Sequence, residues 1–219
     1  MTQTANRLPL AFKLAYTAFM AVLIPVYWYY YGPSNFLYFC DVALILSLIG
    51  IWLESPLLIS MCAVGILIPQ ALWVIDFGAR ALGFSLTGMT DYMFNPNSSL
   101  FLRGLSLFHG WLPFMLVYLV WKLGYDRRGL PAWTATAWVL LLVCFFLMPP
   151  PRPDPGLTPV NINYVWGMSD LAAQTWVSPY LWLAGLMIIL PVIFFLTHLL
   201  LVRFAPKAPD EGSGMKAPA

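Results

Sequence analysis

Cys40 and His109 are the two side chains in this sequence that best suit a reaction inside an apolar environment. A cysteine becomes a good nucleophile when a nearby base favours its thiolate, and histidine often supplies that base. Both residues fall within long apolar stretches, where a polar group is costly and needs a partner or a function. We therefore predict Cys40 as a nucleophile and His109 as its general base. A plainer interpretation also fits, in which the thiol fills space and the imidazole bonds a neighbouring carbonyl or carboxyl group.

Polar residues in the same apolar stretches are predicted to form a binding site beside this pair, and they are Asp41, Gln70, Asp76 and Arg103. At 1.5 Å of rise per helical residue, their positions place them in the same half of a membrane. A guanidinium group matches the geometry of phosphate, so Arg103 suits a lipid headgroup. Asp41, Asp76, Arg80 and Arg103 also fit ion pairs that neutralise one another near the membrane surface.

A polar segment, Thr158 to Gly167 (TPVNINYVWG), adds Asn161, Asn163 and Tyr164 to the predicted binding residues. Its amide and hydroxyl groups stand out in an otherwise apolar chain, although such groups also commonly cap turns in loops.

The sequence contains no recognisable motif for binding a metal ion or a cofactor. Cys40, Cys62 and Cys144 each stand alone, without the paired spacing of a zinc site or of a disulfide framework. We expect no metal ion and no cofactor.

The elements that must position these residues are apolar helices. The 219-residue chain is 61% hydrophobic and 9% charged, whereas soluble domains carry roughly 25% charged residues. About six apolar segments are each long enough to approach a membrane crossing of about 20 residues. They run near Leu10–Tyr30, Asn35–Leu53, Pro56–Phe77, Ser99–Leu123, Pro131–Met148 and Pro179–Phe204. The prediction is an all-α, polytopic membrane protein with one transmembrane domain, residues 1–204, and a disordered cytoplasmic tail, residues 205–219.

The distribution of basic residues predicts the orientation of this bundle. If alternate connections lie on alternate sides, eight basic residues fall on the side of the N-terminus: Arg7, Lys13, Lys122, Arg127, Arg128, Arg203, Lys207 and Lys216. Three fall on the other side: Arg80, Arg103 and Arg152. Because cytoplasmic loops are enriched in Lys and Arg, both termini are predicted to be cytoplasmic, in a multi-pass protein of the cell membrane.

The two long connectors, Gly78–Ser98 and Pro149–Ser178, then both lie on the outer side, next to the predicted site. Long ordered connectors often carry function. Pro113 cannot donate a hydrogen bond to the carbonyl of His109, so we expect a kink beside that histidine.

Three short segments resemble the YwaF-like integral membrane family, which includes the transmembrane protein 164 group. They are Phe36–Leu46 (FLYFCDVALIL), Leu105–Pro113 (LSLFHGWLP) and the pair Asn163-Tyr164. The resemblance implies a bundle of about six helices and a thiol acyltransferase or acyl hydrolase acting on phospholipids. Carried over to this chain, it makes Cys40 the nucleophile and His109 its base.

Two other functions also fit the sequence. Asp41, Asp76, Arg103 and His109 could line a carrier or proton pathway, or the chain could be a non-catalytic subunit of a larger membrane complex. Membrane lipids are the expected partners in each case, a homo-oligomer remains open, and the small net charge of +2 gives no basic surface for nucleic acid.

Overall fold

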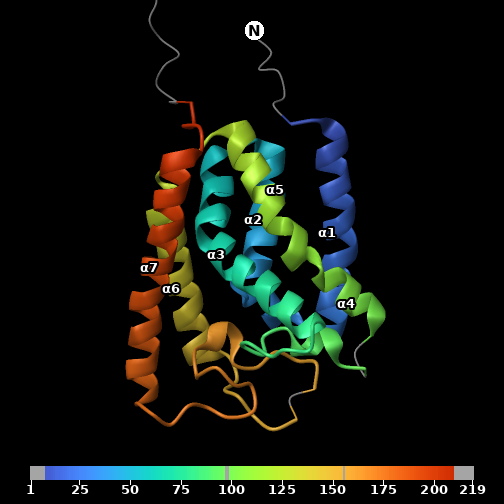
Figure 1. Cartoon of the computed structure of the whole chain (residues 1–219), viewed down its shortest axis with the longest axis vertical. Helices are drawn as coiled ribbons and strands as arrows, with labels where there is room; N and C mark the ends of the chain where they lie inside the picture. The colour runs from blue at the N-terminus through green and yellow to red at the C-terminus, as the bar shows by residue number, and fades with distance from the viewer. Residues whose placement is uncertain (1–7, 97–98, 155, 210–219) are drawn as a thin grey trace, which may run out of the picture.

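The structure is a computed structural model that describes residues 8–96, 99–154 and 156–209. In these ranges the regular elements are all helical, which confirms the predicted all-α fold (Figure 1). The α-helices are α1 (Leu10–Tyr31), α2 (Phe39–Leu53), α3 (Pro56–Ala81), α4 (Leu100–Ser106), α5 (Phe108–Leu123), α6 (Gly129–Leu147) and α7 (Pro179–Phe204). Short 3-10 helices are η1 (Pro33–Leu37), η2 (Asp91–Phe94) and η3 (Ile162–Tyr164).

Five helical segments are long and apolar enough to cross a membrane: α1, α3, the combined stretch Leu100–Leu123, α6 and α7. Helix α2 is apolar but has only 15 residues, which span roughly 22 Å at 1.5 Å per residue. The hydrocarbon core of a bilayer is about 30 Å thick, so α2 is short for a crossing. The chain is therefore a multi-pass membrane protein, and the side on which its termini lie stays a prediction.

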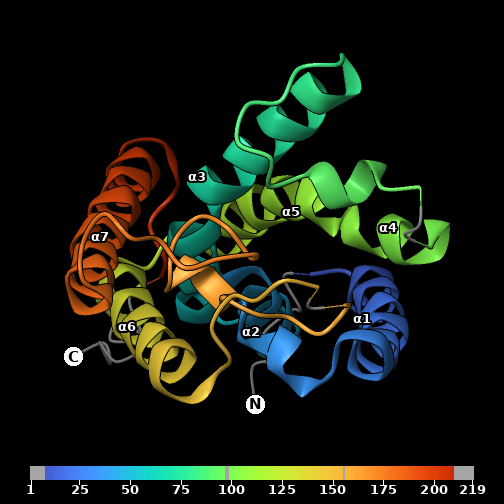
Figure 2. The same ribbon diagram turned by 90° about the horizontal axis from the view of Figure 1, so that it is seen from below.

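Helix α3 is the central element of the bundle, because it packs against α2, α5, α6 and α7. Seen along the bundle, α1 and α7 lie on opposite sides of it (Figure 2). The close approach of α3 and α6 depends on Gly65, since a methyl group there would overlap the indole of Trp133. Trp133 is fully buried and also contacts Phe39 of α2 and Phe194 of α7 through its ring. One aromatic side chain thus connects four helices.

The two ends of the bundle differ. We call the end where α1 begins and α7 finishes the terminal end, and the end that carries the α3–α4 and α6–α7 connectors the loop end (Figure 1). Both long connectors lie at this one end, as the alternating topology predicts. At the terminal end, Lys13 of α1 forms a 2.7 Å ion pair with Glu54, which follows α2.

The start of the C-terminal tail is held in place. The Tyr125 amide donates to the carbonyl of Pro206 at 2.6 Å, and the Ala208 amide donates to the carbonyl of Tyr125 at 3.1 Å. Residues 205–208 therefore differ from the disordered tail that we predicted. The rest of that predicted tail, residues 210–219, lies outside the described residues.

The expected kink beside His109 takes the form of a helix break. Leu107 separates α4 from α5, two residues before His109 and well before Pro113. Gly104 and Gly110 flank this break, and glycine favours a helix less than any residue except proline. The break redirects α4 relative to α5 at the loop end, where the predicted site lies (Figure 1).

The contact between Gly65 and Trp133 gives a direct test of the packing. Gly65→Ala should lower the free energy of unfolding by about 1–3 kcal/mol, because the new methyl group must displace a buried indole. Gly185→Ala on α7 is the matched control, since its methyl group would meet nothing within 4 Å. Thermal unfolding in detergent, followed by circular dichroism, compares the two variants. Equal melting temperatures would contradict the central role of this contact.

Candidate functional site

Cys40 lies in the first turn of α2, at the loop end of the bundle. It is partly exposed, whereas Cys62 and Cys144 are buried. Among the three thiols, Cys40 is therefore the one placed for chemistry.

Asn163 of η3 fixes the start of α2 beside this thiol. Its Oδ1 accepts from the Phe39 amide at 3.1 Å, and its Nδ2 donates to the carbonyl of Leu37 at 2.9 Å. These two bonds satisfy backbone groups on either side of Tyr38, the N-cap residue, which contributes no side-chain cap. Two of the segments that carry the predicted resemblance, around Cys40 and around Asn163, thus meet in the structure.

The segment that contains Asn163 has an unusual backbone. Asn161, Asn163 and Tyr164 have φ values of 50°, 58° and 61°. This left-handed conformation costs non-glycine residues roughly 1–2 kcal/mol each. Asn161 offsets part of the cost: its Nδ2 donates to the Gly167 carbonyl at 2.8 Å, and its Oδ1 accepts from the Trp166 amide at 2.8 Å. Asn161 therefore closes the loop, and the loop presents Asn163 to α2.

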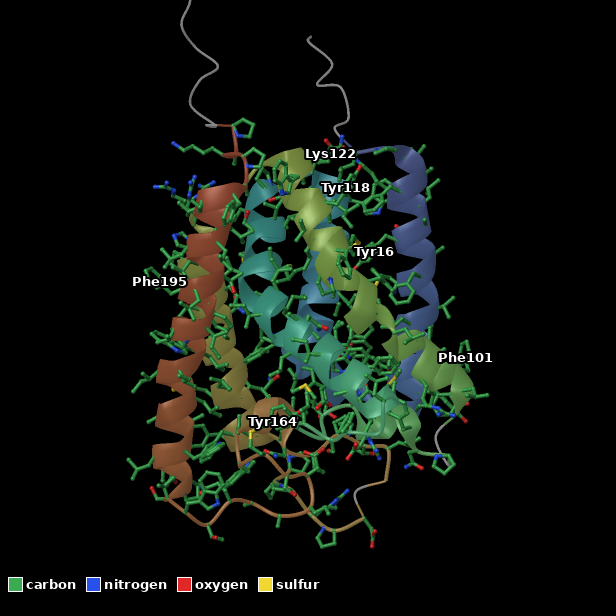
Figure 3. All side chains as sticks on the ribbon, in the orientation of Figure 1. Tyr16, Phe101, Tyr118, Lys122, Tyr164 and Phe195 are labelled. Carbon is green, nitrogen blue, oxygen red and sulfur yellow. The ribbon has the colours of Figure 1, made fainter. Side chains whose placement is uncertain are left out.

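Tyr164 lies at the loop end, at the base of the bundle (Figure 3). Burial raises the pKa of its phenol to about 12, and the neighbouring Asp170 carboxyl and Cys40 thiol act in the same direction. The phenol consequently keeps its proton at neutral pH. Tyr164 is then a neutral hydrogen-bond donor in the neighbourhood of Cys40.

Asp41 is the direct partner of the thiol. Cys40 Sγ donates to Asp41 Oδ2 at 3.8 Å, and Asn35 Nδ2 donates to the same oxygen at 3.3 Å. Asp41 is only 3% exposed, and its second oxygen, Oδ1, is buried without a hydrogen bond to any described residue. A buried polar atom normally has a partner, so this oxygen is available to a ligand.

His109 contacts other residues than Cys40 does. Its Nδ1 lies 2.9 Å from Gln70 Nε2 and 3.0 Å from Gln70 Oε1. Its ring stacks on Trp73, with centroids 4.9 Å apart, and on Phe108. The Gln70 amide therefore orients the imidazole and leaves Nε2 for another partner. In catalytic triads, the general base is likewise oriented by a third group.

The described hydrogen bonds do not join Cys40 to His109, since the thiol bonds Asp41 and the imidazole bonds Gln70. Helix α3, which carries Gln70, packs against both α2 and α5. The predicted catalytic residues thus form two separate pairs in this structure, and their assigned roles stay predictions.

The hydrogen bonds of Asp76 hold a connector in place. Its two oxygens accept four hydrogen bonds, at 2.6–3.0 Å, from the amides and hydroxyls of Thr87 and Thr90. The carboxylate thereby holds the α3–α4 connector against the end of α3. This pairing with two threonines could not be predicted from residue types or spacing, because the fold of that connector decides the contact.

The two arginines near this connector also bond within it. Arg80 pairs with Asp91 at 2.8 Å, and Arg103 Nη1 donates to the carbonyl of Met93 at 3.0 Å. The ion pair among the predicted charged residues therefore involves Asp91, which we did not select, and not Asp41 or Asp76. Arg103 Nε is buried and bonds none of the described residues.

Several contributors to the site escaped the sequence prediction. Asn35 holds Asp41, and the hydroxyls of Tyr27 and Ser106 lie 2.9 Å apart, which links α1 to α4. A polar residue inside an apolar segment is the signal that could have selected Ser106. Within the described ranges, no three His, Cys, Asp or Glu side chains gather as metal ligands would.

Comparisons with known proteins give no identification. No family model matches the chain, and no curated protein and no solved structure matches it. The family resemblance described above remains a prediction, and the site must be interpreted from its own geometry.

The amide of Asn163 provides a test of how the thiol is positioned. Asn163→Ala should destabilise the protein by about 1–3 kcal/mol, because the Phe39 amide and the Leu37 carbonyl lose their partner. It should also change the rate at which maleimide labels Cys40. Asn163→Gly is the control: it removes the same side chain but suits the left-handed backbone, and should cost about 1 kcal/mol less. If Ala and Gly variants match the parent in stability and labelling, Asn163 does not hold α2.

Proposed function

We propose that this multi-pass membrane protein is a thiol-dependent enzyme that removes an acyl group from a phospholipid and passes it to an acceptor. The observation that carries the proposal is the placement of Cys40. Cys40 is partly exposed at a helix start, Asn163 bonds the amide of the preceding Phe39, and the Asp41 carboxyl group accepts a hydrogen bond from the thiol. Fixed geometry of this kind lowers the entropic cost of reaching a reactive arrangement.

In the proposed first step, Cys40 Sγ attacks the carbonyl carbon of a phospholipid ester while its proton moves to the Asp41 carboxylate. The ester C–O bond then breaks, and the departing glycerol oxygen leaves with that proton. The acyl group remains on Sγ as a thioester. Tyr164 is the proposed donor to the carbonyl oxygen as negative charge develops on it, because its phenol stays protonated.

In the second step, an acceptor hydroxyl or water attacks the thioester and gives its proton to His109 Nε2. The thioester C–S bond breaks, and the thiolate recovers a proton from His109. Gln70 supports this role by holding Nδ1. The assignment differs from the one that the resemblance implies, because Asp41 and not His109 contacts the thiol.

The carrier alternative has less support from the geometry. Two of its four predicted lining residues, Asp76 and Arg103, use polar atoms to hold the α3–α4 connector. A binding function without chemistry, as in a subunit of a larger complex, would leave the exposure of Cys40 without a role. Both alternatives predict that no acyl group becomes attached to the protein.

The proposal predicts a covalent acyl adduct on Cys40. Purified protein incubated with phosphatidylcholine should gain the mass of one acyl chain, which hydroxylamine removes because it cleaves thioesters. Cys40→Ala should abolish the adduct, while the matched Cys62→Ala variant should keep it, because Cys62 is buried. Intact-mass spectrometry and peptide mapping provide the measurement. An adduct that is absent from the parent protein, or present in Cys40→Ala, would refute the assignment.

The two proton-handling groups should affect different steps. Asp41→Asn should slow formation of the adduct by roughly 10²-fold or more, the lower end of general acid–base effects. His109→Gln should leave formation nearly unchanged but slow its breakdown, so that acyl-enzyme accumulates. Single-turnover mass spectrometry resolves the two rates. If His109→Gln instead blocks formation of the adduct, His109 is the base for the thiol.

A further inference from the structure

A cavity of about 410 Å³ lies at the loop end, beside the loop that Asn161 closes. Phe145 and Phe146 of α6 and the following Met148 form one wall, Pro179 and Tyr180 of α7 form another, and Trp166 closes it from the connector. Its volume falls within the range of about 300–1,000 Å³ that is typical of small-ligand sites. It is therefore large enough to bind part of a lipid.

The lining is apolar and aromatic with one unused polar group. The rings of Trp166 and Phe145 stack with centroids 4.5 Å apart and an interplanar angle of 15°. Trp166 Nε1 is buried and donates to none of the described residues. A tryptophan N–H can only donate a hydrogen bond, so a suitable ligand must bring an acceptor along with its apolar part.

The surrounding bilayer supplies such a molecule. Phe146 and Tyr180 line the cavity and yet are 60% and 68% exposed. They lie near the ends of the membrane-spanning helices α6 and α7, so their exposed faces adjoin lipid. Tyr180 follows Ser178 and Pro179 at the start of α7, where aromatic residues typically occupy the membrane–water interface. At this depth a phospholipid presents an acyl chain next to its ester carbonyl.

We propose that this cavity binds the acyl chain of a membrane phospholipid, with Trp166 Nε1 donating to the ester carbonyl. Phe145, Met148 and Pro179 give the chain apolar contacts, and a neutral ester carbonyl supplies the missing acceptor for the indole.

The cavity is connected to Cys40 through a shared apolar cluster. Phe145 packs with Ile162 and Val165 of the loop, and Tyr38 and Phe39 pack against the same cluster. Phe39 precedes Cys40 directly, so one packed cluster links a wall of the cavity to the residue next to the thiol. The inference that the bound lipid is the acyl donor rests on the proposed function, whereas the binding itself does not.

Photo-crosslinking tests the binding. Protein in detergent would be loaded with phosphatidylcholine that carries a diazirine on one acyl chain, irradiated, and mapped by peptide mass spectrometry. We expect labelling on residues 145–150 and on Trp166 at several times the level of the lipid-facing middle of α7, near Ile188. Met148→Trp should fill the cavity and reduce this labelling several-fold. Uniform labelling of all lipid-facing helices would overturn the proposal.

Leu147→Trp is the matched control, because Leu147 adjoins Met148 but is 71% exposed and does not line the cavity. It should leave the labelling unchanged. If Leu147→Trp reduces labelling as strongly as Met148→Trp, the effect comes from the helix surface and not from the cavity.

Trp166→Phe provides a second test that keeps the ring and removes the N–H. The parent should retain the ester-linked probe several-fold better than an ether-linked analogue, and Trp166→Phe should lose that preference. Trp176→Phe, at an exposed position, should keep it. If Trp166→Phe keeps the full preference, the ester does not bind this indole.

The Cys40 adduct, measured in the same samples, separates this inference from the proposed function. Labelling of the cavity without any adduct would refute the proposed enzymatic function and support the lipid-binding site. An adduct that forms at the parent rate in Met148→Trp would show that the acyl donor binds elsewhere.

Discussion

Polar backbone groups inside a membrane must find partners within the protein, because hydrocarbon offers none. Helices meet this demand along their length but not at their ends, and the loop end of this bundle shows how it is met there. Asn163 satisfies the Phe39 amide and the Leu37 carbonyl, Asp76 satisfies the Thr87 and Thr90 amides, and Asn161 closes its own loop. Asn163 and Asp76 thus hold two connectors against the helices, and Asn161 closes one of these connectors on itself.

The same constraint explains how much could be predicted from the sequence. Long apolar runs predict the helices within a few residues, since crossing a bilayer needs both length and apolarity. The polar residues inside and beside those runs identify the loop end as the region of interest. Their partners could not be predicted, because a partner depends on which helix faces meet. Asp76 bonds threonines from a connector that has no periodic pattern, and Cys40 and His109 face different neighbours across α3.

The separation of the Cys40–Asp41 and His109–Gln70 pairs gives the candidate site two distinct polar centres. A single dyad would use one base for both halves of an acyl transfer. In the proposed reaction the two centres divide this work, with one activating the thiol and the other activating the acceptor. Trp73 stacks on His109 and also on Phe77, so the second centre is held by aromatic packing as well as by the Gln70 amide. Neutral side chains therefore hold the imidazole of His109 in place.

The backbone hydrogen bonds between Tyr125 and residues 206–208 limit how α7 can move. This helix is pinned at the terminal end, where the Tyr125 hydroxyl also lies 2.6 Å from His198 Nδ1. At its other end it follows a long connector, and Pro191 interrupts the hydrogen-bond ladder along its length. Near that other end, the Trp182 indole donates to the Tyr164 carbonyl at 2.8 Å. Entry of a lipid tail between α6 and α7 would therefore have to break this bond before the loop end of α7 could tilt outward.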